Sequence, residues 1–147
     1  MSLRSFQFEG AFDRDMHAAY DANFSEIFNG MMPTIVPGDL ALPVGPGTYI
    51  LTKGNAAALT LAAPVAGAQN WQMVGGFMVN NGGQDGTRIV ILSGSAQQHV
   101  LTATGLLVTG SASVNTATCA ASAGSALTLR AYNGKWLVES QNQITFG

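Results

Sequence analysis

Short runs of hydrophobic residues, separated by turn-forming residues, fill the chain from residue 48 to its end. Leu127 and Leu129 alternate with other residues before Asn133-Gly134, and Trp136 and Val138 alternate after it. This pattern predicts a β-hairpin with a type I′ turn, because Asn and Gly tolerate the positive φ angles that the turn requires. Similar runs predict further short strands at 48–52, 59–62, 71–74, 77–79, 87–93, 99–103, 106–109, 115–121 and 143–146, beside the hairpin strands 126–132 and 135–140.

The first 47 residues follow a different pattern. Five apolar residues recur there at intervals of three, four and one: Met16, Tyr20, Phe24, Ile27 and Phe28. This spacing predicts a short amphipathic helix that Asp13 caps and Asn29-Gly30 ends. The helix packs either on its own domain or, as an arm, on a neighbouring subunit. Four prolines between residues 33 and 46 then predict an extended connector, so we divide the chain into an arm with connector, 1–47, and a body, 48–147.

No helical pattern separates the predicted strands of the body. The expected class is therefore all-β: an antiparallel β-sandwich or jelly-roll-like body with an N-terminal arm. A trimeric β-prism or solenoid is the alternative, although no fixed short repeat is visible. The continuous run from Ile89 to Leu92 predicts a strand covered on both faces. Cys119, the single cysteine, excludes an intrachain disulfide and is expected to be a small buried hydrophobe.

Charged residues are scarce, and this scarcity narrows the class of function. They make up 10% of the chain, against about 25% in an ordinary soluble domain. A surface of uncharged polar groups loses little solvation energy when another protein covers it. The net charge of −2 argues against nucleic acid as a partner. Residues 59–68 form the longest apolar stretch, which is too short to span a membrane, and residues 1–30 lack the apolar run of a signal peptide.

The body offers few residues for catalysis. After residue 39 its only acids are Asp85 and Glu139, and its only histidine is His99. Asp85 lies in a glycine-rich turn and Glu139 near the end of a predicted strand, so a glycosidase pair is not expected. His99 is expected to be a hydrogen-bonded structural histidine. We expect no enzyme activity, no cofactor and no metal. Trp71 and Trp136 are interpreted as core residues, with a carbohydrate platform as the alternative.

Several stretches of the body, taken in order, resemble β-rich virion proteins of tailed bacteriophages and prophages, a group that includes capsid decoration (cement) proteins. The resemblance covers roughly residues 48–146. It implies a protein on the outer surface of an icosahedral capsid, assembled in the bacterial cytoplasm, that bridges major capsid proteins and forms homodimers or homotrimers. The stretches are YILT from Tyr49, LTLAAP from Leu59, DGTRIVILS from Asp85, QHVLTATG from Gln98 and SALTLRAYNGKW from Ser125.

The aromatic residues of the arm are the predicted interface, because aromatic side chains anchor buried contacts between proteins. They are Phe6, Phe8, Phe12, Tyr20, Phe24 and Phe28. The second hypothesis is a tail-fibre or baseplate β-domain that binds host-surface carbohydrate through Trp71 or Trp136. The third is a lyase or hydrolase fragment, which requires Asp85, Glu139 or His99 to meet in one cleft.

Overall fold

The computed structural model describes residues 32–147. The described residues form twelve β-strands and no helix, so the all-β class is confirmed. The predicted helix lies outside the described residues. The strands are β1 (Pro33–Val36), β2 (Leu40–Leu42), β3 (Gly47–Leu51), β4 (Ala58–Leu61), β5 (Trp71–Val74), β6 (Phe77–Asn80), β7 (Arg88–Ser93), β8 (Val100–Thr109), β9 (Ala112–Cys119), β10 (Ala126–Tyr132), β11 (Lys135–Asn142) and β12 (Ile144–Phe146).

Ten strands join in one sheet that is mixed, not antiparallel as expected. The order is β1-β3-β7-β10-β11-β8-β4-β2, with β9 paired to β8 and β12 paired to β9. Strands β7, β10 and β11 pair antiparallel, but β1–β3, β3–β7, β11–β8, β4–β8 and β2–β4 pair parallel. Residues 52–87 connect β3 to β7, and residues 62–99 connect β4 to β8. Both connections are long enough to return the chain to the same end of the sheet without a helix.

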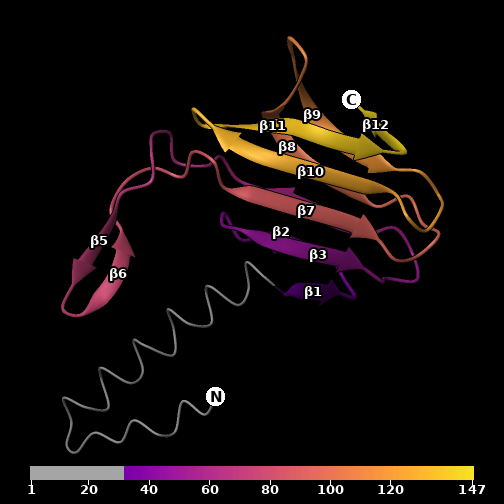
Figure 1. Ribbon diagram of the computed structural model, residues 1–147. Helices are drawn as coiled ribbons and strands as arrows, with labels where there is room; N and C mark the ends of the chain where they lie inside the picture. Colours follow the sequence, from indigo (N-terminus) through magenta and orange to yellow (C-terminus); the bar gives the residue numbers. More distant parts are fainter. Residues whose placement is uncertain (1–31) are drawn as a thin grey trace, which may run out of the picture.

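The sheet curls and brings its two ends near each other. Strands β1 and β2 stand at opposite ends of the strand order, yet only residues 37–39 separate them. Both lie within the segment expected as a connector, and both pair with strands of the body. The curled sheet is visible in Figure 1. A small internal space of about 10 Å³, room for about one water, is lined from several strands, among them by Leu51, Ile91, Leu127, Leu59, Leu101 and Ala117.

The core lies inside this curled sheet, and Trp136 is its largest fully buried side chain. The Trp136 side chain is fully buried, and its indole Nε1 donates a hydrogen bond to the Ala62 carbonyl at 2.9 Å. Ile89 and Ile91 of β7 are buried, whereas the intervening Val90 is half-buried. The prediction that β7 is covered on both faces therefore holds fully for one face and only in part for the other. Cys119 is buried in β9, as predicted.

Two turns show how local sequence sets the strand boundaries. Asn133 and Gly134 have φ angles of 49° and 75°, as the predicted type I′ turn requires, and β10 ends immediately before them. Two separate strands, 99–103 and 106–109, were expected on either side of Gly105. Instead β8 runs through Gly105, whose φ is 66°, and the pairing of β8 with β9 is irregular there. The glycine bends one long strand because it can adopt a left-handed conformation.

Candidate functional site

A small hairpin projects from the curled sheet and forms a sheet of its own. Strands β5 and β6 pair antiparallel with each other only, and Figure 1 shows them to one side of the main sheet. Gly75 and Gly76 link them with φ angles of 59° and 86°, which are the values of a type I′ turn. The strands were predicted from sequence; their position outside the core was not.

Both faces of this hairpin are apolar. Residues opposite each other on paired strands project to the same face, and neighbours along a strand alternate between faces. The register pairs Trp71 with Asn80 and Met73 with Met78 on one face, which we name face A. It pairs Gln72 with Val79 and Val74 with Phe77 on the other, which we name face B. Each face therefore carries three apolar side chains and one amide.

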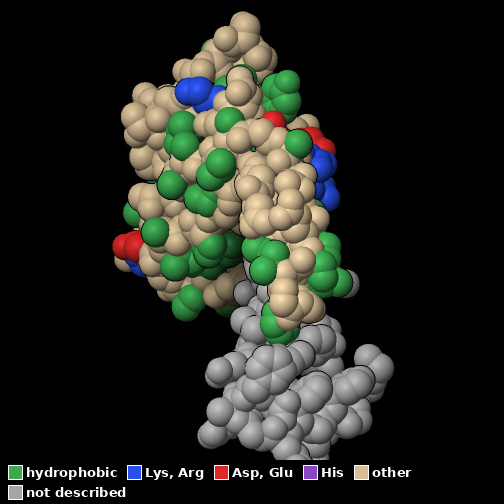
Figure 2. All heavy atoms as spheres, turned by 90° about the vertical axis from the view of Figure 1, so that its left-hand side faces the viewer, with side chains coloured by type: hydrophobic (Ala, Val, Ile, Leu, Met, Phe, Trp, Pro, Cys, Tyr) green, Lys and Arg blue, Asp and Glu red, His purple; other side chains and the backbone are tan. Residues whose placement is uncertain are grey.

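These apolar side chains are exposed. Met73 is 69% exposed and Val74 is 52% exposed, one from each face. An isolated two-stranded hairpin is marginally stable in water, and clustered exposed hydrophobic residues mark a site of interaction. In Figure 2, which looks from the hairpin side, charged side chains lie at the edges of the outline, and hydrophobic and uncharged polar groups fill the rest. Residues 54–84 contain no charged side chain.

Asn80 ties the base of the hairpin together. Its Oδ1 accepts hydrogen bonds from the backbone N–H groups of Asn70 and Gly82, each at 3.0 Å. Its Nδ2 donates to the Gly83 carbonyl at 3.0 Å. The backbone N–H of Gly83 in turn donates to the Ala68 carbonyl at 2.9 Å. The two chain segments that form the base, residues 68–70 and 80–83, are thus joined by both backbone and side-chain hydrogen bonds.

Gln84 and Asp85 fasten this base to the main sheet. The Gln84 side chain accepts a hydrogen bond from Val65 N–H at 2.8 Å and donates one to the Val44 carbonyl at 2.8 Å. The Asp85 carboxylate accepts the backbone N–H of Asn133 at 2.8 Å. These bonds fix where the hairpin leaves the body. An apolar element that is anchored in this way is presented for contact with little freedom left to lose on binding.

The two tryptophans have different environments. Trp71 lies on face A and is 50% exposed, and its Nε1 donates to the Gln69 side chain at 2.9 Å. Gln69 also donates to the Asp85 carbonyl at 3.2 Å, so the base of the hairpin orients the indole. Trp136 is buried in the core as expected, and this burial removes it as a carbohydrate platform. Trp71 was expected in the core, and the structure places it on the surface instead.

His99 and Asp85, two of the residues considered for catalysis, do not meet in one cleft. The Asp85 carboxylate accepts a hydrogen bond from Asn133, just after the end of β10. At the opposite end of β10, the Ser93 N–H donates to the carbonyl of Ser125, just before the strand starts. His99 contacts Ser95 near that second end, so the seven-residue β10 separates it from Asp85 by about 20 Å. Within residues 32–147, no group of three or more His, Cys, Asp or Glu side chains is placed to hold a metal ion.

Glu139 belongs to an exposed ion-pair cluster on the outer face of the sheet. Its carboxylate lies 2.8 Å from the Arg130 guanidinium and 3.5 Å from that of Arg88. The hydrogen bond from Arg130 is the main reason that the pKa of Glu139 lies below its usual value. A carboxylate held ionised between two arginines is a poor general acid, and exposed ion pairs of this kind contribute little to stability.

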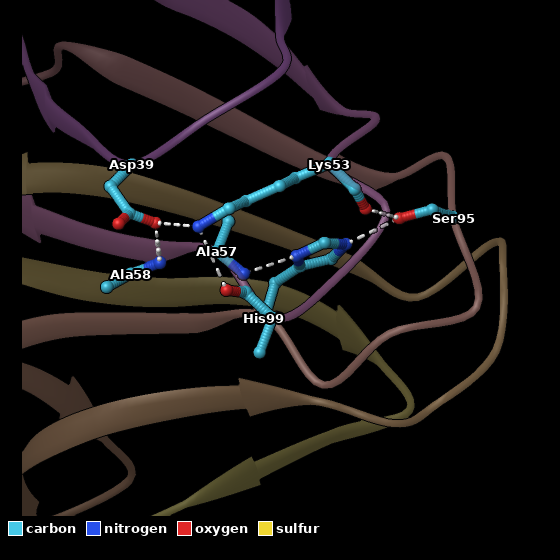
Figure 3. A network of polar contacts seen from close by, with 7 residues as sticks. Asp39, Lys53, Ala57, Ala58, Ser95 and His99 are labelled. Atoms are coloured by element: carbon cyan, nitrogen blue, oxygen red, sulfur yellow. Dashed lines mark hydrogen bonds and ion pairs between the residues drawn. The ribbon is translucent and has the colours of Figure 1, made fainter.

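His99 is a structural histidine, as predicted, and joins its own loop, residues 94–99, to the loop of residues 52–57 (Figure 3). Its Nδ1 accepts the Ala57 N–H at 3.0 Å, so in the neutral ring the proton is on Nε2, which faces the Ser95 hydroxyl at 2.9 Å. That hydroxyl donates to the Lys53 carbonyl at 2.8 Å. Burial and, to a lesser extent, the positive charge of Lys53 lower the pKa of His99. The ring therefore favours its neutral form in the fold.

This arrangement predicts a loss of stability in mild acid. Below pH 6.5, about the ordinary pKa of histidine, His99 takes up a proton in the unfolded chain more readily than in the folded one. The free energy of unfolding should then fall by up to about 1.4 kcal/mol per pH unit until the folded pKa is reached. Denaturant unfolding at pH 7.0, 6.0 and 5.0 measures this slope.

A matched variant isolates the histidine. His99→Gln retains an acceptor for the Ala57 N–H and does not titrate, so its stability should change less over the same range. Asp39 and Glu139, whose pKa values are lowered by Lys53 and Arg130, begin to destabilise the fold only at lower pH. Equal slopes for the variant and the wild-type chain would contradict the role given to His99.

The predicted interface residues of the arm lie outside the described residues. They are Phe6, Phe8, Phe12, Tyr20, Phe24 and Phe28. Their role therefore stays a prediction. In the described part of the chain, no helix is long and apolar enough to cross a membrane.

Comparison with known proteins identifies no family. No protein-family model and no curated protein gives a significant match to the chain. The exposed hairpin is therefore the feature from which a function is best argued. Its two strands could be read from the sequence, because Gly75-Gly76 separates two apolar runs. Its exposure could not, since apolar residues on both faces normally indicate an interior strand.

Proposed function

We propose that this chain is a structural virion protein, most specifically a capsid decoration protein of a tailed bacteriophage. It binds the outer surface of the major capsid lattice and stabilises that lattice through self-association. The observation that carries the proposal is the anchored β5–β6 hairpin, which exposes apolar side chains on both faces. A soluble monomer has little reason to keep such an element uncovered. In this proposal the chain is not an enzyme and needs no cofactor.

The scarcity of charged residues supports a function in which other protein molecules cover much of the surface. Over residues 32–147, several charged groups already satisfy one another: Lys53 bonds to Asp39 at 2.7 Å, and Arg130 bonds to Glu139 at 2.8 Å. Most of the remaining surface can be covered without stripping water from ions. A decoration protein that associates with itself binds its lattice at several points, so each contact can be weak while the whole is firmly held. For the body we propose a jelly-roll-like sandwich that includes the parallel pairings.

The arm supplies the contact with the capsid in this proposal. It precedes β1 in the chain, and β1 is an edge strand of the sheet. Residues 1–31 carry two basic and five acidic side chains, whereas the described residues carry four basic and three acidic ones. The difference in charge and the six aromatic residues distinguish the arm from the body.

Deletion of residues 1–30 tests this assignment. We expect the truncated chain to keep its folded body, measured by thermal unfolding, and to lose binding to shells assembled from the major capsid protein encoded with it. Co-sedimentation with such shells and electron microscopy of decorated particles give the readout. Full decoration by the truncated chain would show that the arm is not the capsid contact. Failure of the full-length chain to bind shells at all would overturn the decoration function.

A second function is favoured by one observation, the exposed indole of Trp71. Amide side chains surround it, including Gln69, which bonds to the ring, and Asn80, which lies opposite it in the register. An exposed aromatic ring beside amides is suited to a sugar, as in a tail-fibre or baseplate domain that binds host-surface carbohydrate. Binding to a glycan array that disappears in Trp71→Ala would support this function. Absence of glycan binding by the wild-type chain would remove it.

A further inference from the structure

Two loops cross the same end of the curled sheet. Residues 52–57 connect β3 to β4, and residues 94–99 connect β7 to β8. Strand β3 pairs parallel with β7 in one half of the strand order, and β4 pairs parallel with β8 in the other half. Both loops therefore run from the first half to the second at the same end, and we call them together the cap. The internal space of about 10 Å³ is lined by Leu51 and His99, so the cap lies over that end of the core.

The side chain of His99 holds the two loops of the cap together (Figure 3). The ring is fully buried, and its Nδ1 accepts the Ala57 N–H of the other loop at 3.0 Å. Its Nε2 faces the Ser95 hydroxyl, which donates to the Lys53 carbonyl of the other loop at 2.8 Å. The backbone bonds between these segments lie at the ends of the loops, next to the paired strands. Between those ends, the loops are joined through the ring and the hydroxyl beside it.

A proton added to the ring breaks this connection. The nitrogen that takes it is Nδ1, because Nε2 already carries the proton of the neutral ring. A protonated Nδ1 donates and no longer accepts, so it would point its hydrogen at the Ala57 N–H. Ala57 is buried, and a buried donor without an acceptor destabilises the arrangement that holds it.

The groups around the ring do not offset a positive charge. Lys53 faces it from the 52–57 loop and carries the same charge. Asp39, from the segment between β1 and β2, is already bonded to Lys53 at 2.7 Å and to the Ala58 N–H at 2.8 Å. Cys119 of β9 lies beside the space under the ring, and the other residues that line this space are apolar. Among residues 32–147, no carboxylate forms an ion pair with His99. A charged ring is therefore stabilised only where water reaches it.

We propose that protonation of His99 in mild acid opens the cap, so that the 52–57 loop leaves the 94–99 loop and water reaches the internal space while the sheet stays paired. The sheet persists because the pairing of β3 with β7 and of β4 with β8 does not involve the ring. Loops of this kind open at a lower free energy than the strands that they cover. This acid-sensitive device does not depend on the decoration function.

The thiol of Cys119 reports on the cap. Cys119 is the only cysteine of the chain, it is buried, and it lines the same space as His99. The full-length chain is mixed with a pyridyl disulfide, a thiol reagent that also reacts in acid, at pH 7.0, 6.0 and 5.0. Each rate is divided by that of the chain unfolded in urea at the same pH, which removes the pH dependence of the thiol itself. This ratio should rise by up to about tenfold per pH unit below the ordinary pKa of histidine.

Low concentrations of urea distinguish opening of the cap from unfolding of the whole chain. Global unfolding exposes a large surface and depends steeply on urea, whereas a local opening exposes little and hardly depends on it. We expect the reaction of Cys119 to be nearly independent of urea below the unfolding transition. Hydrogen exchange at the Ala57 amide should behave in the same way. The Leu127 amide, in the middle of the sheet, should exchange only through global unfolding.

Two substitutions assign the opening to one histidine. His99→Gln does not titrate, so its reaction ratio should stay nearly constant from pH 7.0 to 5.0. His17→Gln removes the other histidine of the chain and is the matched control. Its ratio should rise in acid as that of the wild type does.

Three results would overturn the acid-sensitive cap. A wild-type ratio that does not change over this pH range would show that the cap stays closed. A rise that depends on urea as steeply as global unfolding would show that the whole chain opens, and an equal rise in His99→Gln would assign the opening to another group. If His99→Gln does not fold, the pH and urea dependences of the wild type still decide. Binding to shells is measured separately, so the cap and the decoration function can fail independently.

Discussion

Replacement of Trp136 by alanine should lower the free energy of unfolding by about 3–5 kcal/mol, the range for removing a large buried aromatic side chain. The Trp136 side chain is fully buried inside the curled sheet. The substitution leaves a cavity, and it also removes the hydrogen bond from Nε1 to the Ala62 carbonyl. Urea unfolding followed by circular dichroism, at matched protein concentrations, measures the difference.

The second tryptophan provides the control. Trp71→Ala removes the same atoms from a side chain that is half exposed and outside the core, so it should change stability by less than about 1 kcal/mol. Trp136→Phe should fall between the two, since it retains most of the volume but loses the indole donor. Similar losses for Trp71→Ala and Trp136→Ala would mean that the hairpin contributes to the core of the isolated chain.

Replacement of Gly83 by alanine should cost about 3 kcal/mol, because the added methyl group has no space. A Cβ at this position would meet the Gly67 carbonyl oxygen, and it would approach the Ala66 carbonyl oxygen to 2.5 Å. Both contacts are with backbone, which cannot rotate away as a flexible side chain would. The base of the hairpin must then separate, and the bond from Gly83 N–H to Ala68 is lost with it. Denaturant unfolding measures the cost, and hydrogen exchange at residues 67–84 locates it.

Gly54→Ala is the matched control for this substitution. A Cβ at Gly54 has no atom within 4 Å, and its φ angle is not in the left-handed region. Its stability should equal that of the wild type or slightly exceed it, since alanine restricts the unfolded chain. If Gly83→Ala is also neutral, the base of the hairpin is less closely joined than the structure indicates.

Local features of the fold could be predicted from the sequence because they depend on neighbouring residues. The type I′ turn at Asn133-Gly134 follows from the φ preferences of two residues, and β10 occupies the predicted range. The parallel pairing of β3 with β7 could not be predicted in this way. It joins residues that lie about 40 positions apart, such as Tyr49 and Ile91, and alternation within each strand does not specify its partner.

The candidate site was predicted as two strands, and its Trp71 was misplaced as a core residue. Two apolar residues in succession, such as Met73 and Val74, indicate a strand that is covered on both faces. The prediction made from the same pattern in β7 was only partly correct, since Val90 is half-buried. A sequence pattern shows that a strand will be covered, but it does not show whether the cover comes from the same chain. That distinction depends on the assembled subunits.

The brevity of the border strands has a consequence for how copies can aggregate. Strands β1, β2 and β12 have four, three and three residues, and Pro33 removes one backbone donor from β1. A border this short offers an incoming chain few hydrogen bonds, so it is a poor template for fibril growth. We expect concentrated solutions to remain free of filaments that bind thioflavin T.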